Sequence, residues 1–323
     1  MFKFRNFVII IYYLIINYCI ADNNKLVLKK VSKNFWVYNA SNESPNKFNN
    51  GLIANLTVII GDKHTLVYDS GPSKQFAESF INQIKSISNN PIKYLIISHR
   101  HFDHAYGIEP FIKEGAKIYF DKKEFEYFKT EGPKINKLLI ENLGFNKNNI
   151  NFSNVMATSI HFFNGKSIID LGNRKVLIEN LGNAHTKGDI IIYDFQSKTY
   201  VTGDFVFQGR AAAFSDANLK LWMSKLKTKL DLPWVKIIPG HGKIINNNKD
   251  LNDTKLWLSF LNKSIITALS QGDMISEIFE YPMPKALDAL IMKDITLRQG
   301  IKKQINYYKN KKIIEKYLKR VIK

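Results

Sequence analysis

Apolar residues in the first part of the chain follow two periodicities, and each predicts a different kind of element. Residues 26–40 alternate partly between apolar and polar positions, which predicts one or two strands. Two β-rich runs, 52–60 and 64–70, flank a Gly-Asp-Lys turn and predict a hairpin. Residues 73–87 are expected to form a helix, because their large apolar residues recur at helical spacing: Phe76, Phe80, Ile81, Ile84 and Ile87.

Strands and helices continue to alternate up to about residue 250. Short apolar runs predict further strands at 92–98, 116–120, 168–171, 175–181, 190–194, 199–203 and 235–238. Helical stretches are expected from the end of the strand at 116–120 to about Leu143, and again after residue 250. The later helix would place one apolar face inward, formed by Trp257, Leu258, Leu261, Ile265 and Leu269. Strands mixed with helices, each strand ending in a polar loop, predict a layered α/β domain.

The N-terminal residues 1–21 have the three-part layout of a secretory signal peptide. Lys3 and Arg5 precede an apolar run, and Ala21 provides a small residue before a cleavage position at Asp22. The sequence therefore predicts export to the periplasm or outside the cell. The alternative is an uncleaved membrane anchor, although the apolar run is shorter than the roughly 20 residues that a spanning helix needs. Cleavage would also remove Cys19, the only cysteine.

Composition narrows the classes of protein that fit. A length of 323 residues suits one large α/β domain with an appendage. The single cysteine excludes a disulfide scaffold and any cysteine-based zinc or iron–sulfur site. The 47 Lys and Arg residues against 28 Asp and Glu give a net charge of +19, which can indicate nucleic acid or an anionic membrane as a partner. The charge is spread along the chain rather than concentrated in a stripe, so we expect no nucleic-acid partner.

The basic C-terminal segment 301–323 has two interpretations. It contains nine Lys and Arg residues and a single acid, Glu315. Ile313, Ile314, Tyr317, Leu318 and Val321 would form one apolar face of a helix. The segment could dock on an anionic membrane surface. We favour a terminal helix that packs on the domain, because the apolar stripe is short and lacks tryptophan and phenylalanine.

Histidines and aspartates gather where predicted strands end. His99, His101, Asp103 and His104 fall within six consecutive positions after the strand at 92–98. His185, Asp204 and His241 follow three later strand-like runs and lie in glycine-bearing loops. Neutral imidazoles and carboxylates are ligands that zinc and similar divalent metals prefer. These seven residues together predict a metal site. His64 and His161 lack such a context and are not expected to bind a metal.

The spacing His-x-His-x-Asp-His, followed by Gly-x-x-His-Thr-x-Gly, Thr-Gly-Asp and Pro-Gly-His-Gly, resembles the metallo-β-lactamase superfamily over roughly residues 26–245. The resemblance implies an αββα four-layer sandwich at 22–250 and a helical extension at 251–323. It implies a first metal held by His99, His101 and His185. It implies a second metal held by Asp103, His104 and His241, with Asp204 as the bridge. Asp69, in Val-Tyr-Asp-Ser-Gly, matches a buried aspartate that orients ligands in the family.

Particular residues narrow the branch of the superfamily. His101 stands where oxygen-reducing di-iron members carry a glutamate, so that branch is not expected. Asp204 stands where one group of β-lactamases has a cysteine, whereas hydrolases resembling glyoxalase II, thioesterases and lactonases keep an aspartate. Residues 203–212, followed by Asp216 and Trp222, resemble most closely the exported quinoprotein relay system zinc metallohydrolases.

The resemblance implies an exported hydrolase with two zinc ions, with iron or manganese as alternatives. A hydroxide shared by the metals would attack an ester, thioester, lactone or amide carbonyl of a small molecule. Asp103 and Asp204 would act catalytically by offsetting metal charge and holding the hydroxide's proton. Arg210 could bind an anionic substrate group or be purely structural. Two alternatives remain: an iron-dependent persulfide dioxygenase, and a non-catalytic accessory protein for a periplasmic quinoprotein dehydrogenase.

Overall fold

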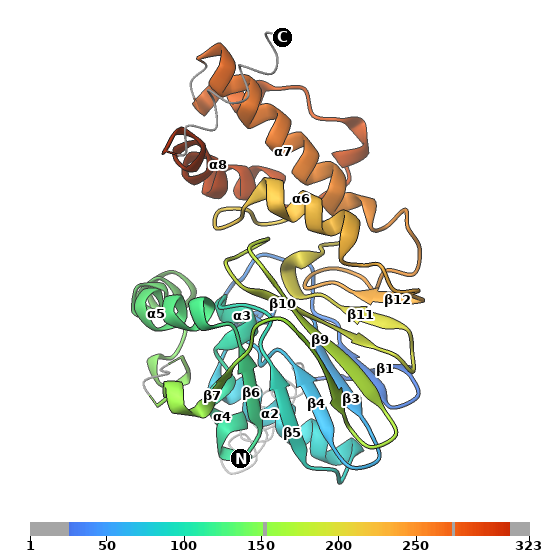
Figure 1. The fold of residues 1–323 in the computed structure, drawn as a ribbon. Helices are drawn as coiled ribbons and strands as arrows, with labels where there is room; N and C mark the ends of the chain where they lie inside the picture. Colours follow the sequence, from blue (N-terminus) through green and yellow to red (C-terminus); the bar gives the residue numbers. More distant parts are fainter. Residues whose placement is uncertain (1–25, 151–153, 273–274, 311–323) are drawn as a thin grey trace, which may run out of the picture.

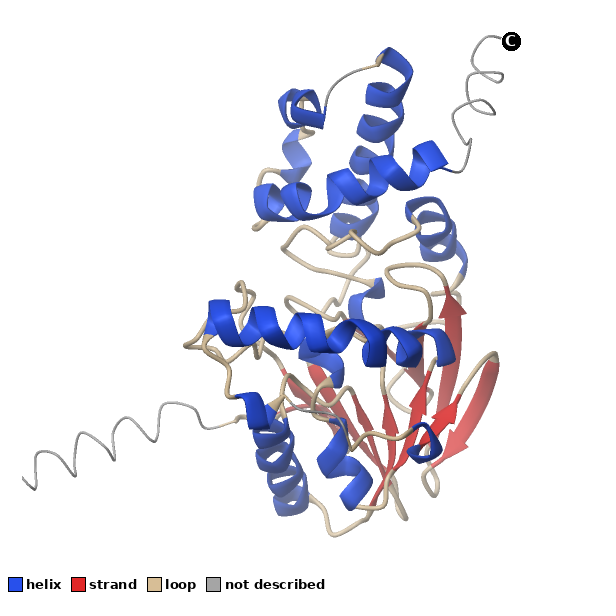
Figure 2. Cartoon of the chain, turned by 90° about the vertical axis from the view of Figure 1, so that its left-hand side faces the viewer, coloured by secondary structure: helices blue, strands red, loops and turns tan. Residues whose placement is uncertain are grey.

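Two β-sheets are stacked face to face, and helices cover both outer faces (Figures 1 and 2). The structure, a computed structural model, describes residues 26–150, 154–272 and 275–310. The predicted αββα sandwich with C-terminal helices is confirmed. The signal peptide predicted at 1–21 lies outside the described residues and stays a prediction. Within the described ranges, no helix combines the length and the apolar character needed to cross a membrane.

The first sheet contains seven strands in chain order. They are β1 (Lys29–Ser32), β2 (Phe35–Tyr38), β3 (Leu56–Ile60), β4 (Thr65–Tyr68), β5 (Ile92–Ile96), β6 (Lys117–Phe120) and β7 (Ile160–Phe162). Strands β1 to β4 pair antiparallel, which confirms the hairpin formed by β3 and β4, whereas β4 to β7 pair in parallel. Sequence reasoning missed β7, because three residues are too few to show a periodicity.

The second sheet contains five strands in the order β12-β11-β10-β9-β8. They are β8 (Lys166–Asp170), β9 (Lys175–Gly182), β10 (Asp189–Asp194), β11 (Thr199–Val201) and β12 (Lys236–Ile238). Neighbours pair antiparallel except β11 and β12, which are parallel. The strands β9, β11 and β12 therefore all end at the same edge of this sheet.

Within the described residues, helices lie on the outer faces of the sheets, at one edge of the sandwich and in the C-terminal extension (Figure 1). They are α2 (Lys74–Ile87), α3 (Phe102–Ala105), α4 (Ile108–Lys113), α5 (Lys122–Leu143), α6 (Leu219–Thr228), α7 (Asn252–Gln271) and α8 (Lys293–Asn310). The predicted helix at 73–87 is confirmed, and it begins where the Ser73 hydroxyl accepts a hydrogen bond from the backbone N–H of Phe76. Helix α5 likewise begins at Asp121, whose carboxylate accepts from two backbone N–H groups.

Three buried apolar clusters fill the spaces between the layers. Tyr68, Ile96 and Ile192 belong to the cluster between the two sheets. A second cluster joins the first sheet to α2, α4 and α5. The third joins the second sheet to α6, α7 and α8, so the C-terminal helices share a core with the sandwich.

The start of the basic segment 301–323 belongs to α8. Ile301, Ile305 and Tyr308 are buried in the third cluster. This first part of the segment therefore packs on the domain, whereas the predicted apolar face at 313–321 lies outside the described residues, and its packing stays a prediction. Residues 311–323 lie outside the described ranges, and contact with a membrane surface stays a prediction.

Candidate metal centre

All seven predicted ligands lie together at one edge of the sandwich. His99 follows β5, His185 follows β9, and Asp204 and His241 follow β11 and β12. The carboxyl ends of parallel strands meet at the same edge of a sheet, which brings these loops together. The remaining ligands are supplied by the short helix α3 and by the residue before it. Two groups of side chains that could each hold a metal ion result, His99–His101–His185–Asp204 and Asp103–His104–His241.

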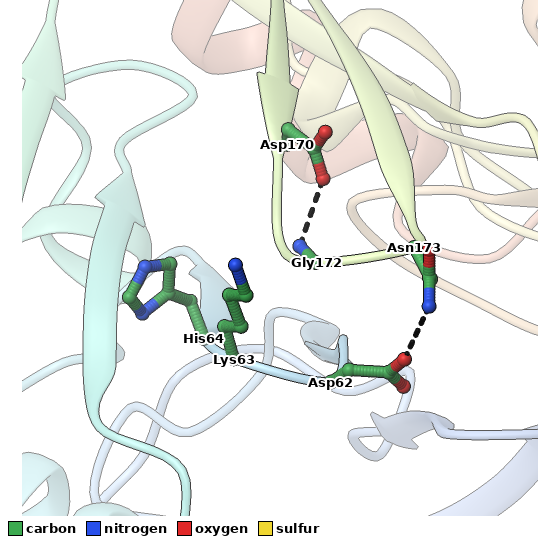
Figure 3. A pocket seen from close by; sticks show the side chains of 6 residues that line it. All are labelled: Asp62, Lys63, His64, Asp170, Gly172 and Asn173. Atoms are coloured by element: carbon green, nitrogen blue, oxygen red, sulfur yellow. Dashed lines mark hydrogen bonds between the residues drawn. The ribbon is translucent and has the colours of Figure 1, made fainter.

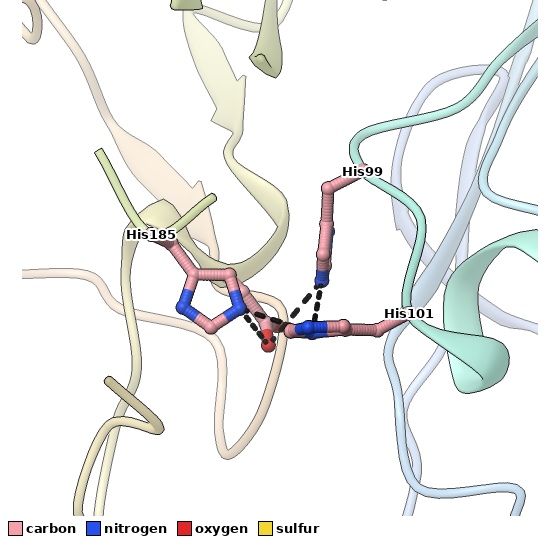
Figure 4. Close-up of side chains that lie close together, drawn as sticks. His99, His101 and His185 are labelled. Carbon is pink, nitrogen blue, oxygen red and sulfur yellow. Dashed lines mark hydrogen bonds and ion pairs between the residues drawn. The ribbon is translucent and has the colours of Figure 1, made fainter. Parts of the chain in front are cut away.

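The first group of donor atoms comes from three imidazoles and one carboxylate. Figure 4 shows the rings of His99, His101 and His185 pointing toward one another. Nδ1 of His101 lies 2.9 Å from Nε2 of His99 and 3.2 Å from Nε2 of His185. Oδ2 of Asp204 lies 3.3 Å from Nε2 of His185 and 3.8 Å from Nε2 of His99. His101 thus turns Nδ1 inward, whereas the other two rings turn Nε2 inward.

The second group uses the other oxygen of the same aspartate. Oδ1 of Asp204 lies 3.1 Å from Nε2 of His104 and 3.2 Å from Nε2 of His241. Oδ2 of Asp103 lies 3.5 Å and 3.4 Å from the same two nitrogens. Each carboxylate oxygen of Asp204 therefore faces one group, which is the position that a bridging ligand requires.

Metal ions fit these donors. Nε2 of His104 and Oδ1 of Asp204 are buried and lie 3.1 Å apart, but neither has a hydrogen-bond partner of suitable geometry among the described residues. Buried polar atoms without partners are costly, so a native protein rarely leaves them so. The donor atoms of each group lie within 4.8 Å of one another, and the set of imidazoles and carboxylates is one that divalent metals prefer.

Each histidine uses its other ring nitrogen as a donor to a fixed acceptor. The Nδ1–H of His104 donates to Oδ2 of Asp69 at 2.7 Å. The Nδ1–H of His99 donates to the Ser98 hydroxyl at 2.9 Å, and this hydroxyl donates to Asp69 at 2.9 Å. The corresponding acceptors of His185 and His241 are the backbone carbonyls of Ala213 and Ile53, at 3.0 and 2.8 Å. Such partners set the tautomer and direct the free nitrogen toward a metal.

The electrostatics keep several donors in the form that binds a metal. Burial lowers the pKa of His185 to about 3 and, with the neighbouring histidines, lowers the pKa of His99 well below its usual value. Both rings are therefore neutral at pH 7. Burial alone would raise the pKa of Asp204, but His241 and His104 outweigh it and hold that pKa well below its usual range. Burial likewise opposes charge on His104, but Asp103, Asp204 and Asp69 outweigh it and raise its pKa. Metal binding would have to displace this proton.

Asp69 lies where the resemblance implied. It is fully buried directly after β4, and its carboxylate accepts hydrogen bonds from His104 and from the backbone N–H and hydroxyl of Ser98. Burial raises its pKa, although the hydrogen bonds from His104 and Ser98 favour its ionised form. Its carboxylate thus connects the outer nitrogens of one ligand from each group.

The outer partner of His101 was not predicted from the sequence. Oδ2 of Asp216 lies 3.3 Å from Nε2 of His101 and 3.0 Å from Nη2 of Arg100. Arg100 also bonds Glu124 and Glu131 on α5 and lies over the ring of Tyr127. Asp216 is 115 positions from His101, and no local pattern in the sequence links two residues that lie so far apart.

Arg210 lies beside the second group rather than at the surface. Only 6% of the residue is exposed, and Nη1 is 3.3 Å from Nδ1 of His241. Nη1 also donates to the Glu43 carbonyl at 3.4 Å, while Nε is buried and has no hydrogen-bond partner within the described part of the chain. Burial lowers the pKa of Arg210. Its predicted role in binding substrate stays a prediction.

His64 and His161 lie outside the cluster, as expected. His161 is an exposed residue of β7. His64 lines a cavity of about 510 Å³ formed by the β3–β4 and β8–β9 turns, with Asp62, Lys63, Asp170, Gly172 and Asn173 (Figure 3). These turns are at the opposite ends of the strands from the metal-binding loops. This cavity therefore belongs to the far edge of the sandwich.

The chain belongs to the metallo-beta-lactamase superfamily, because that family's sequence profile matches residues 49–241. Its relatives include metallo-beta-lactamase IND-1 of Chryseobacterium indologenes, which is 23% identical over 195 residues, or 58% of this chain and 71% of that protein. With the site present, the chain is a metal-dependent hydrolase of this superfamily.

Solved structures have the same fold at low sequence identity. TMB-1 matches with a TM-score of 0.55 and 18% identity, over 72% of this chain and 97% of that one. A metallo-beta-lactamase from Pontibacter korlensis matches with a TM-score of 0.54 and 18% identity, over 72% and 99%. The inverting sec-alkylsulfatase Pisa1 from Pseudomonas sp. matches with a TM-score of 0.66 and 16% identity, over 87% of this chain but 50% of that one.

Proposed function

We propose that this hydrolase holds two zinc ions and cleaves an ester, thioester, lactone or amide of a small molecule. The proposal rests mainly on the position of the Asp204 carboxylate. Its Oδ2 faces the first group of donors and its Oδ1 faces the second. His99, His101 and His185 would hold the first ion, and Asp103, His104 and His241 the second. The relatives named as metallo-beta-lactamases support an amide among the candidate bonds.

The chain's own residues supply orientation and charge. Two bound zinc ions would lower the pKa of a coordinated water and polarise the substrate carbonyl. Asp103 and Asp204 are buried carboxylates that offset metal charge and can accept a hydrogen bond from that water. Asp69, Ser98 and the carbonyls behind the histidines fix the rings, so that little reorganisation is needed during reaction. Arg210 supplies a buried positive charge beside His241 for an anionic substrate group.

Two other functions keep the same fold. A persulfide dioxygenase would use one iron. The second group of donors, Asp103, His104 and His241, would then hold no metal. An accessory protein for a periplasmic quinoprotein would keep both groups but turn over no generic substrate. The resemblance of residues 203–212 to the quinoprotein relay subgroup supports that context and stays a prediction. We also propose that the chain is exported, on the pattern of residues 1–21.

Metal analysis of the full chain, purified without added metal, tests the proposal. We expect two divalent ions per chain, mainly zinc, and hydrolysis of at least one member of an ester, thioester, lactone and β-lactam panel. His104→Ala should lower occupancy to one ion and activity by more than about 100-fold, since even outer partners of ligands contribute about 10- to 100-fold. The exposed His161→Ala is the matched control and should change neither.

Three results would contradict the proposal. Two tightly held ions in His104→Ala would refute the ligand assignment. One iron per chain would favour the dioxygenase. Two ions without turnover of any substrate in the panel, together with a co-purifying dehydrogenase, would favour the accessory protein.

A further inference from the structure

The segment 209–217, between Asp204 and α6, carries outer partners of two histidines of the first group. The Ala213 carbonyl accepts from Nδ1 of His185 at 3.0 Å. Oδ2 of Asp216 lies 3.3 Å from Nε2 of His101. This segment has no helix or strand of its own, so contacts from outside it must fix its backbone.

Those contacts come largely from the C-terminal helices and the loop between them. Oδ2 of Asp253, in α7, accepts from the backbone N–H of Gly209 at 2.8 Å. Nε1 of Trp257 donates to the Ala212 carbonyl at 2.9 Å. The backbone N–H of Ala211 donates to the Ile291 carbonyl at 3.0 Å. The extension therefore holds the first half of the segment through its backbone.

Helix α8 holds the second half. Nε2 of the buried Gln304 donates to the carbonyls of Phe214 and Ala217, at 2.8 and 2.9 Å. These two bonds hold the backbone before and after Asp216. Nζ of Lys303 lies 3.2 Å from Oδ1 of Asp216, whose other oxygen faces His101. One helix turn of α8 thus contacts the backbone and the side chain that orient His101.

We propose that α7 and α8 are part of the metal centre, because they fix the 209–217 segment and through it orient His101 and His185. Asp216 and Gln304 are positioning residues for the first group. The inference rests on the proposed metal-binding function and extends it to a part of the chain that carries no recognised motif. The side chain of His101 is 28% exposed, whereas His99 and His185 are buried, so His101 depends most on an outer partner to hold its ring.

Zinc affinity of the full chain, measured by competition with a chromophoric chelator, tests the inference. Asp216→Ala should weaken one of the two zinc sites by about 10- to 100-fold, the range for outer partners of ligands. Asp216→Asn keeps an oxygen that can accept from Nε2 of His101, and should restore most of that affinity. Gln304→Leu has a similar size but no donors, and should weaken the same site by a smaller factor. Lys302→Ala, an exposed neighbour on α8, is the control.

Unfolding of each metal-free variant separates positioning from general stability. We expect Asp216→Ala and Asp216→Asn to have similar unfolding midpoints, since both lose the ion pairs with Arg100 and Lys303, while their zinc affinities differ. Wild-type affinity at both sites in Asp216→Ala and Gln304→Leu would overturn the inference. Equal losses of affinity in Asp216→Ala and Asp216→Asn would also overturn it. A wild-type chain that binds no zinc would instead refute the proposed function.

Discussion

Single residues of the centre are held in place by buried groups that are not ligands themselves. Asp189 illustrates this at the loop that carries His185. Its carboxylate accepts from the backbone N–H of Thr186 at 2.9 Å and from the Thr186 hydroxyl at 2.7 Å. Burial, followed by the negative charge of Glu124, raises the pKa of Asp189 to about 7. This residue connects the stability of the His185 loop to pH.

The sign of that connection follows from proton linkage. Between about pH 4 and pH 7, Asp189 is protonated in the folded chain and ionised in the unfolded chain. Its contribution to stability is therefore full below about pH 4 and is lost as the pH rises through about 7. Asp189→Asn removes the titration and keeps an oxygen that accepts from Thr186. The free energy of unfolding of the wild type, relative to this variant, should fall by up to about 1.4 kcal/mol per pH unit over that window.

Denaturant unfolding of the metal-free proteins between pH 4.5 and 8 measures this difference. Subtracting the variant removes contributions from the histidine cluster, which both chains share. A difference that stays constant or grows with pH would show that Asp189 is ionised throughout in the folded chain.

At the scale of elements, the close approach of two backbone segments positions Asp204, the proposed bridging ligand. The loop after β12 passes directly beside the start of η3 (Gly203–Phe205), which carries Asp204. A Cβ atom added at Gly240 would lie 2.1 Å from Oδ1 of Asp204 and 2.6 Å from the carbonyl carbon of Gly203. The Pro-Gly-His-Gly motif thus needs glycine at position 240, because a side chain there would overlap with the carboxylate of Asp204.

Gly240→Ala should therefore displace Asp204 and weaken both metal sites. We expect a loss of at least one ion per chain after dialysis against a weak chelator, measured by elemental analysis. Gly115→Ala is the control, because a Cβ there meets no atom within 4 Å, although its positive φ of +79° makes alanine strained. That control should lose about 1 kcal/mol or more of stability and keep its metals. Full metal content in Gly240→Ala would refute the packing argument.

At the scale of the whole molecule, one core joins the sandwich to the C-terminal helices. Trp222, Trp257 and Ile301 lie in a single buried cluster with residues of the second sheet. Because they share this core, we expect folding of the extension and formation of the edge that carries the candidate ligands to be coupled. The boundary predicted at residue 250 marks where the recognised motifs end. That it also separates two domains stays a prediction.

Export is a property of the whole chain and can be tested directly. Expressed in a host with a periplasm, the full chain should be recovered there or in the medium with an N-terminus near Asp22, as read by mass spectrometry. Replacing Ile10 and Leu14 by lysine should abolish cleavage, because the apolar run is what a signal peptide requires. Uncut wild-type chain in the membrane fraction would favour the anchor, and uncut chain in the cytosol would refute export.

The layered fold, most strands and helices, and the seven candidate metal ligands could all be predicted from the sequence. These features repeat short local patterns: period-two and period-3.6 apolar spacing, and histidines and aspartates directly after strands. The orientation of these side chains, in contrast, depends on contacts that form only in the folded chain. Asp216 is 115 positions from His101, and the Ala213 and Ile53 carbonyls belong to a backbone that every residue has. Contacts between distant segments, and contacts made by backbone atoms, leave no pattern in the order of residues, so folding has to bring them together before they can be recognised.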